Sequence, residues 1–428
     1  MRAVFTLIAF ATALALTAQR PAPATTSTKN TLVKGGTVHV GDGRVIDDGA
    51  VGFRNGRIDY VGFDYGATAA YDTVVDAKGM HVYPGLIVPD NTLGLHEIDL
   101  VRATSDEDEV GEMEPELRAL TSFKTDSRII PTVRSNGVLI EQVTPRGGVI
   151  SGTSSVVHLD AWDWEDATIK ADDGVHLNWP RSFQRTGWWA ERGETNREKA
   201  DERRKKLDEI DRFFKRARAY AAAIPAVIDL RMEAMRGLFD GSKMLYAHAD
   251  RAREIQEAVL FARELGVKRT VLVGGYDAWR VADLLRDNKV DVILRIVHSL
   301  PLRDDDDIDL PYRLPALLKE RGIRFCLSYT SEHERAGSRN LAFLAGSAAA
   351  HGLSSEDALR SITLDAAAIL GIDKDYGSLE VGKSATLFIS TGDALDMRTN
   401  NVVHAYIQGR KISLVDHQKQ LYQQYKSR

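Results

Sequence analysis

Residues 81–97 constrain the fold of this chain more than any other segment. An apolar run at residues 80–88 is interrupted only by a Pro-Gly pair, which is typical of a buried strand entered through a tight turn. The strand is expected to end at Pro89. The Asp-Asn-Thr sequence at residues 90–92 then places polar groups at the C-terminal end of a buried strand, where α/β barrels assemble their active sites.

The length and composition bound the class of protein. A chain of 428 residues has room for one barrel of roughly 250 residues and a smaller domain. Hydrophobic residues make up 43% and charged residues 27%, which is ordinary for a globular protein. The net charge of -5 provides no basic footprint for nucleic acid, so that class of partner is excluded.

The first residues predict export. Met1-Arg2 precedes residues 3–16, which carry no charge, and this is the pattern of a secretory signal peptide, assigned to residues 1–18. Cleavage is expected after Ala18 or Ala24. The apolar run is shorter than the roughly 20 residues of a spanning helix, so no membrane association is expected after cleavage. The mature protein is predicted to be periplasmic or secreted, with a disordered leader at residues 19–30 that is rich in Pro, Ala, Thr and Ser.

Two segments carry a family resemblance. Residues 75–87, Val-Asp-Ala-Lys-Gly-Met-His-Val-Tyr-Pro-Gly-Leu-Ile, resemble the lead-in to the first barrel strand of the amidohydrolase superfamily, in its imidazolonepropionase-like branch. Residues 377–388, Gly-Ser-Leu-Glu-Val-Gly-Lys-Ser-Ala-Thr-Leu-Phe, resemble the turn and return strand of the same family. The resemblance implies an α/β fold in which a (β/α)8 TIM-like barrel is inserted in a small composite β-sandwich domain.

The resemblance also implies the domain boundaries. The composite sandwich is assigned to residues 31–80 and 381–414, the barrel to residues 81–380 and a C-terminal tail to residues 415–428. Within the barrel, strand-like and helix-like segments alternate, which is typical of βα units. After the first strand, further strands are expected at residues 138–143, 155–159, 244–248, 270–273, 290–296 and 323–327. One strand of the eight is not placed. Helices are expected at residues 198–223, 251–265 and 339–351, the first as an amphipathic helix packed on the barrel.

The resemblance implies a catalytic divalent metal held at the ends of strands 1, 5, 6 and 8, sometimes with a carboxylated lysine from strand 4. His248 stands where the family has its strand-5 histidine. The other aligned positions carry residues that differ from the family pattern, namely Val88, Asp90, Thr92, Gly274 and Thr330. No strand-4 lysine can be placed. The ligand set of an ordinary family member is therefore degenerate in this chain.

Two substitutes for the missing groups are predicted. Asp90 and His248 could hold zinc or a similar divalent ion together with His298, since carboxylate and imidazole are suitable ligands. Alternatively, Glu332 and His333, just past the expected strand-8 position, could supply acid-base function or bind substrate.

Three classes of function remain open. The family resemblance implies hydrolysis of carbon-nitrogen bonds other than peptide bonds, in a small amide or peptide-like substrate. The second class is a catalytically inactive barrel that binds a ligand or a catalytic partner subunit, and a homo-oligomer is possible in either case. The third is a binding module for peptides or glycans, in which Trp188 and Trp189 line a pocket on an aromatic loop.

Overall fold

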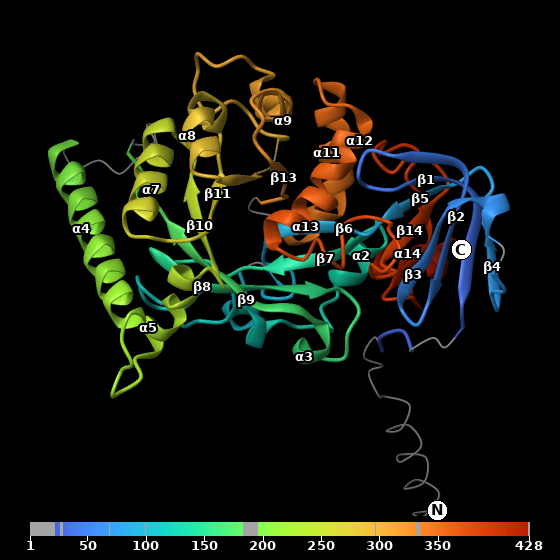
Figure 1. The fold of residues 1–428 in the computed structure, drawn as a ribbon, viewed down its shortest axis with the longest axis horizontal. Coiled ribbons are helices and arrows are strands. Elements are labelled where there is room, and N and C mark those ends of the chain that lie inside the picture. The colour runs from blue at the N-terminus through green and yellow to red at the C-terminus, as the bar shows by residue number, and fades with distance from the viewer. Residues whose placement is uncertain are drawn as a thin grey trace, which may run out of the picture.

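The computed structural model describes residues 22–25, 29–67, 69–98, 100–182, 196–295, 297–330 and 334–426. Two sheets organise this part of the chain, one forming a barrel and the other a separate β domain beside it (Figure 1). Blue strands from the beginning of the chain and red strands from its end lie together in the second domain (Figure 1). The barrel is thus inserted between the two halves of a β domain, which confirms the predicted fold class.

Eight strands form the barrel sheet, in the order β13-β12-β11-β10-β9-β8-β7-β6. They are β6 (Leu86–Asn91), β7 (Val138–Val143), β8 (Ile150–His158), β9 (Thr168–Asn178), β10 (Met244–Ala249), β11 (Thr270–Gly274), β12 (Asp291–Leu294) and β13 (Phe325–Leu327). The hydroxyl of Ser328, just past β13, donates a hydrogen bond of 2.5 Å to the carbonyl oxygen of Pro89 in β6. Side chains therefore bridge the two edge strands where the barrel closes.

One strand departs from the predicted βα alternation. β8 is antiparallel to both neighbours, β7 and β9, while the other barrel pairs are parallel. Only residues 144–149 join β7 to β8, and parallel strands need a crossover of about a dozen residues or more. The short connection therefore forces a hairpin here, and a three-strand meander replaces two βα units.

The first barrel strand also differs from its prediction. The apolar run of residues 80–88 is divided at Gly85 into two strands that belong to different sheets, β5 (His81–Pro84) and β6. A Cβ atom on Gly85 would lie 2.9 Å from Thr386 and 3.0 Å from Leu139, so the close approach of both sheets requires glycine. β6 continues past Pro89 to Asn91, because the carbonyl of Asn91 accepts a hydrogen bond from the amide of Thr144.

Helices lie around the outside of the barrel sheet (Figure 1). The α-helices of the described chain are α2 (Ile130–Arg134), α3 (Trp164–Ala167), α4 (Asn196–Ala221), α5 (Leu230–Met235), α6 (Gly237–Asp240), α7 (Ala252–Glu264), α8 (Ala282–Asp287), α9 (Leu310–Glu320), α10 (Glu334–Gly337), α11 (Leu341–Ala350), α12 (Ser355–Ser361), α13 (Leu364–Leu370) and α14 (His417–Tyr425). Short 3₁₀ turns lie at Asp64–Gly66, Arg102–Thr104, Ala119–Ser122, Ala278–Val281 and Ser338–Asn340. The three helices expected from the sequence are confirmed as α4, α7 and α11.

The long helix α4 packs on the barrel through its apolar stripe. Ile210, Phe214 and Ala217 are buried in the main hydrophobic core. Phe214 meets Phe261 of α7 edge to face, with ring centroids 5.1 Å apart. The stripe is therefore used for internal packing, as its spacing predicted.

The second sheet joins the two ends of the chain. Its strand order is β16-β15-β14-β5-β1-β2-β3, and β4 pairs with β1 beside β5. The bounds are β1 (Thr31–His39), β2 (Val45–Arg54), β3 (Arg57–Phe63), β4 (Thr73–Asp76), β14 (Leu387–Ser390), β15 (Val402–Ile407) and β16 (Arg410–Lys411). This domain has a hydrophobic core of its own, which includes Val38, Phe53 and Leu387.

A short piece of the N-terminal stretch lies against the barrel. The amide of Ala24 donates to Asp160 Oδ2 at 2.9 Å, and Arg410 donates to the carbonyl of Ala24 at 3.1 Å. Ala24 is thus held in place within the segment that was predicted to be disordered. Among the described residues, no helix is long and apolar enough to cross a membrane.

A buried histidine makes stability depend on pH. Burial, reinforced by the charge of Arg410, lowers the pKa of His158 to about 4, below its ordinary value of 6.5. The unfolded chain therefore binds the proton first, and stability that is complete above pH 6.5 is lost as the pH falls toward 4. At pH 5 we expect the contribution of His158 to the free energy of unfolding to be about 2 kcal/mol smaller than at neutral pH. The His158→Gln variant should not show this decrease. Urea unfolding at pH 7.5 and 5.0 measures this difference. His417 is exposed, so His417→Gln serves as the control. The same change in the free energy of unfolding between the two pH values in both variants would show that His158 is not its source.

Candidate functional site

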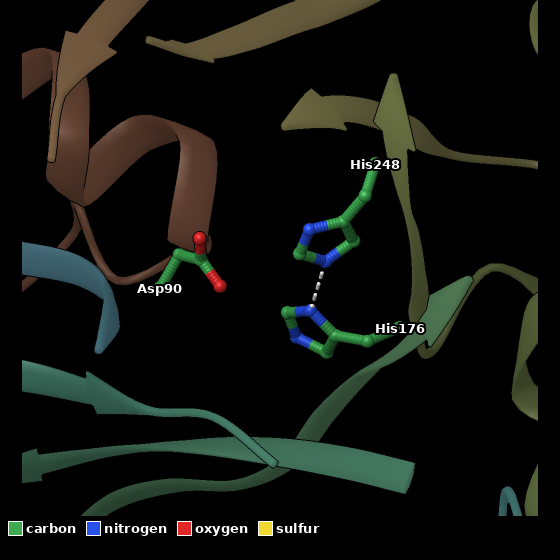
Figure 2. Close-up of side chains that lie close together, drawn as sticks. All are labelled: Asp90, His176 and His248. Carbon is green, nitrogen blue, oxygen red and sulfur yellow. Dashed lines mark hydrogen bonds between the residues drawn. The ribbon is translucent and has the colours of Figure 1, made fainter. Parts of the chain in front are cut away.

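Three barrel strands bring one carboxylate and two imidazoles together. Asp90 comes from β6, His176 from β9 and His248 from β10, and one ligand atom of each lies within 4.8 Å of those of the others. Nδ1 of His176 and Nε2 of His248 are hydrogen-bonded at 2.9 Å, and the carboxylate of Asp90 lies beside both rings (Figure 2). We call these three residues the Asp-His-His group.

The backbone of Asp90 is turned out of the strand conformation. Its φ angle is 50°, in the left-handed region that aspartate tolerates better than most residues. Its amide donates to Gln142 Oε1 at 3.0 Å, while its carbonyl accepts from Arg146 and Thr330, both at 3.0 Å. These contacts hold the backbone in an uncommon conformation, with the Asp90 carboxylate beside the two imidazoles.

A buried polar network supports Gln142. The amide nitrogen of Gln142 donates to Asp173 Oδ2 at 2.9 Å. Ser154 and Tyr246 place their hydroxyl groups 2.6 Å from the two oxygens of the same carboxyl group. Complete burial raises the pKa of Asp173, although these hydrogen bonds work in the opposite direction. Asp173 therefore fixes Gln142, and through Gln142 the backbone of Asp90.

The site keeps its three members in the protonation states that metal binding requires. Burial by itself would raise the pKa of Asp90, but the positive charge of Arg146, with lesser contributions, lowers it to about 2. Burial lowers the pKa of His176 to about 3 and that of His248 well below its ordinary value, and Arg295 lowers the latter further. At neutral pH the group is one carboxylate with two neutral imidazoles, the forms that bind metals.

Two arginines contact the group. Arg146 Nη1 donates to Asp90 Oδ1 at 2.9 Å, and Arg295 Nη2 donates to His248 Nδ1 at 2.8 Å. A guanidinium group only donates, so Nδ1 of His248 must be unprotonated and its proton lies on Nε2, which donates to His176. Nε2 of His176 is buried, and within the described chain it has no hydrogen-bond partner.

The residues fit a divalent cation in type, burial and protonation. Three protein ligands from imidazole and carboxylate are the set found at catalytic zinc sites, which keep one position open. With His176 Nδ1 accepting from His248, the proton of His176 lies on its unpartnered Nε2, which is therefore a donor in this arrangement and not a cation ligand. The two guanidinium groups nevertheless oppose a cation: Arg146 uses an oxygen of Asp90, and Arg295, by donating to Nδ1 of His248, keeps that ring's proton on Nε2.

The structure shows the surroundings of Gly274 and Thr330, two residues at positions where the resemblance implied a histidine and an aspartate. Gly274 has a φ angle of 103°, and a Cβ atom there would lie 2.5 Å from Asp250 Oδ1. No histidine side chain can therefore replace Gly274 without moving Asp250. At the strand-8 position, the hydroxyl of Thr330 donates to the Asp90 carbonyl and lies 3.3 Å from its Oδ2, so Thr330 positions Asp90.

The other predicted site residues have different surroundings. His298 is not brought to the Asp-His-His group; its Nε2 lies 2.6 Å from Ser347 Oγ and its ring packs on Tyr312. Trp188, Trp189, Glu332 and His333 lie outside the described residues.

His176 is the site residue that sequence reasoning missed. It lies on β9, the fourth barrel strand, from which the resemblance implied a carboxylated lysine. β9 begins Thr-Ile-Lys-Ala-Asp-Asp-Gly, and only its second half is fully buried, so it shows no continuous apolar run. The available signal was its end, Val175-His-Leu-Asn178, in which apolar and polar residues alternate.

Part of the chain matches a known protein family, and the whole fold matches solved structures. The amidohydrolase family model matches residues 232–412, which include β10–β13 and the returning strands of the second sheet. An amidohydrolase from Thermotoga maritima has a TM-score of 0.77 to this chain, with 23% sequence identity, covering 90% of this chain and 99% of its own. No curated protein matches the sequence significantly.

Two further solved structures share the fold. A Xaa-Pro dipeptidase with methionine bound in its active site has a TM-score of 0.55 and 14% identity, covering 90% of this chain and 100% of its own. An adenosine deaminase from Xanthomonas campestris with bound zinc has a TM-score of 0.52 and 16% identity, covering 95% and 99%. At these identities the likeness shows the fold, which is that of amidohydrolase-type barrels.

Proposed function

We propose that this chain is a member of the amidohydrolase family, in its imidazolonepropionase-like branch, and that it hydrolyses carbon-nitrogen bonds other than peptide bonds. The observation that carries the proposal is the Asp-His-His group, in which Asp90 and His176 are buried and His248 is partly buried, because its members converge at the C-terminal ends of barrel strands. The family match over residues 232–412 supports it, and residues 75–87 are the basis for the branch.

The proposed site has a division of roles. Asp90, His176 and His248 would hold a divalent cation, which supplies the Lewis acidity for attack of water on an amide. Thr330 and Arg146 orient Asp90 through its backbone and carboxylate. Glu332 and His333 follow Thr330 closely in the sequence, and we assign them to acid-base function or substrate binding.

The proposed substrate is a small amide or peptide-like molecule. One structural neighbour is a Xaa-Pro dipeptidase and another is an adenosine deaminase, so enzymes acting on small peptide-like and amine-bearing molecules share this fold. Trp188 and Trp189, which precede α4 in the sequence, are proposed to contact the substrate. Trp188→Ala is expected to weaken substrate binding.

A second function has a specific observation in its favour. Arg146 and Arg295 occupy acceptors of Asp90 and His248, and Thr330 stands where the family has its catalytic aspartate. A barrel with these features would bind a ligand or a catalytic partner subunit without turnover.

Metal analysis tests the proposed hydrolase. The purified protein is dialysed, its zinc, manganese and iron are measured by elemental analysis, and cyclic amides and dipeptides are screened for hydrolysis. We expect about one equivalent of metal, lost in His248→Ala, together with turnover of at least one amide. Absence of metal after incubation with zinc or manganese, and absence of turnover, would favour the non-catalytic barrel.

We also propose that the chain is exported and acts in a periplasmic or extracellular compartment. Cleavage after Ala18 would retain the Ala24 contacts with Asp160 and Arg410, whereas cleavage after Ala24 would remove them. N-terminal sequencing of the protein recovered from the medium or periplasm tests both points, and an intact Met1 in the cytoplasm would exclude export.

A further inference from the structure

Arg295 lies between two acceptors, one of which belongs to the proposed site. Its Nη2 atom is 2.8 Å from Nδ1 of His248, and its Nη1 atom is 3.7 Å from Oδ2 of Asp250. His248 is on β10 and Asp250 directly follows that strand, while Arg295 follows β12. The Arg295 side chain is about one-third exposed, at 34%, although its Nε atom is buried.

The present contact removes His248 as a ligand. A neutral imidazole has a single nitrogen lone pair, and a guanidinium group can only donate. While Arg295 donates to Nδ1, the proton of His248 therefore stays on Nε2, which faces Nδ1 of His176 at 2.9 Å. His248 then offers no free lone pair to a cation, and the charge of Arg295 adds repulsion at short range.

The second acceptor provides an alternative position for Arg295. The Asp250 carboxylate is an ion-pair partner of Arg295 at 3.7 Å, and its side chain is 37% exposed. It occupies the space beside Gly274 that a larger side chain at that position would need. A small rotation of the guanidinium group toward Asp250 would release Nδ1 of His248. The proton of His248 could then move to Nδ1, which would leave Nε2 to bind a cation beside His176.

We propose that Arg295 is a positioning residue that controls cation binding by exchanging between His248 and Asp250. Bound to His248, it holds the tautomer that cannot accept a cation. Bound to Asp250, it frees that histidine to join Asp90 and His176. This inference rests on the proposed function of the Asp-His-His group as a metal site.

Three variants distinguish the hydrogen bond from Arg295, the positive charge of Arg295 and the negative charge of Asp250. Arg295→Met removes the donor while keeping an unbranched side chain, Arg295→Lys keeps a donor and a positive charge, and Asp250→Asn removes the charge of the alternative partner. The dissociation constants for Zn²⁺ and Mn²⁺ are measured by calorimetry on the metal-free full-length protein. The tautomer of His248 is read from the ring ¹⁵N chemical shifts of ¹⁵N-histidine-labelled protein, assigned with His248→Gln.

We expect Arg295→Met to bind the cation at least about tenfold more tightly, since a charge-assisted hydrogen bond no longer has to be broken. Arg295→Lys should stay near the wild type. Asp250→Asn should bind several-fold more weakly than the wild type but have no effect in the Arg295→Met background. The ¹⁵N shifts should report a proton on Nε2 of His248 in the wild type and a change of tautomer population in Arg295→Met.

Other outcomes would overturn the inference. Equal affinity of the wild type and Arg295→Met would show that Arg295 does not compete with the cation, even if the wild type is a working metal hydrolase. A proton on Nδ1 of His248 in the metal-free wild type would exclude the hydrogen bond itself. If neither protein binds a cation at millimolar concentration, the metal site and the control by Arg295 both fail. If Arg295→Met does not fold, judged by circular dichroism, the wild-type ¹⁵N shifts and the Asp250→Asn affinity still decide.

Discussion

The His176→Ala variant is expected to bind a divalent cation at least about a hundredfold more weakly than the wild type. His176 is completely buried, and burial keeps its imidazole neutral with a pKa of about 3. Loss of a direct ligand should cost more than loss of an outer-shell partner, which costs 10–100-fold in affinity. Calorimetric titration with Zn²⁺, combined with elemental analysis after dialysis, measures the effect, and hydrolysis of any amide substrate should fall with it.

The matched control is His298→Ala. His298 is another histidine of the barrel, but its Nε2 contacts Ser347 Oγ at 2.6 Å and it does not belong to the Asp-His-His group. Its removal should leave the cation affinity unchanged within about twofold, as expected for a residue that makes no contact with the site. A larger loss in His298→Ala than in His176→Ala would instead support the metal site predicted from the sequence alone, with Asp90, His248 and His298.

The Asp173→Ala variant should lose about 3–5 kcal/mol of the free energy of unfolding. Gln142, Ser154 and Tyr246 all hydrogen-bond to the Asp173 carboxyl group inside the barrel. Truncation leaves these buried polar groups without their partner, and each unsatisfied group costs about 1–3 kcal/mol. A whole domain is stable by only about 5–15 kcal/mol, so the loss should be large in urea unfolding at pH 7.

Two further variants test whether the hydrogen bonds to Asp173 account for the loss of stability in Asp173→Ala. Asp173→Asn keeps the shape and one acceptor, and because burial raises the pKa of Asp173, a neutral side chain should be tolerated with a loss below about 2 kcal/mol. Asp201→Ala removes an exposed carboxylate that, among the described residues, pairs with Arg204 on α4, and should change stability by less than about 0.5 kcal/mol. Similar losses in all three variants would contradict a specific role for the network.

The fold was accessible from the sequence where apolar runs are continuous. β7, β10 and β11 each contain a run of at least three consecutive apolar residues, which indicated their positions, and β7 has the predicted bounds. β9 was missed because its first half carries polar residues that are partly exposed. The reversed direction of β8 was missed because strand patterns are the same in either direction, and only the length of the connection distinguishes them.

The candidate site was accessible only in part. Asp90 was named from its place after the first strand and from the family resemblance, and His248 from the resemblance; the structure places both in the Asp-His-His group. His176 and His248 are 72 positions apart in the chain, and they meet because β9 and β10 pair in parallel with Asn178 opposite His248. That pairing could not be deduced once β9 was unplaced.

From the sequence alone, the resemblance of residues 75–87 and 377–388 implied the barrel with its β domain made from both chain ends. Apolar segments, which have short-range physical causes, placed most of the barrel strands. The sequence also determined which groups are available at the strand ends, including Asp90 and His248. The tertiary structure alone decided that His176 completes the group and that Arg146 and Arg295 occupy its acceptors. Such contacts depend on strand register and barrel closure, which are set by packing between segments far apart in the chain.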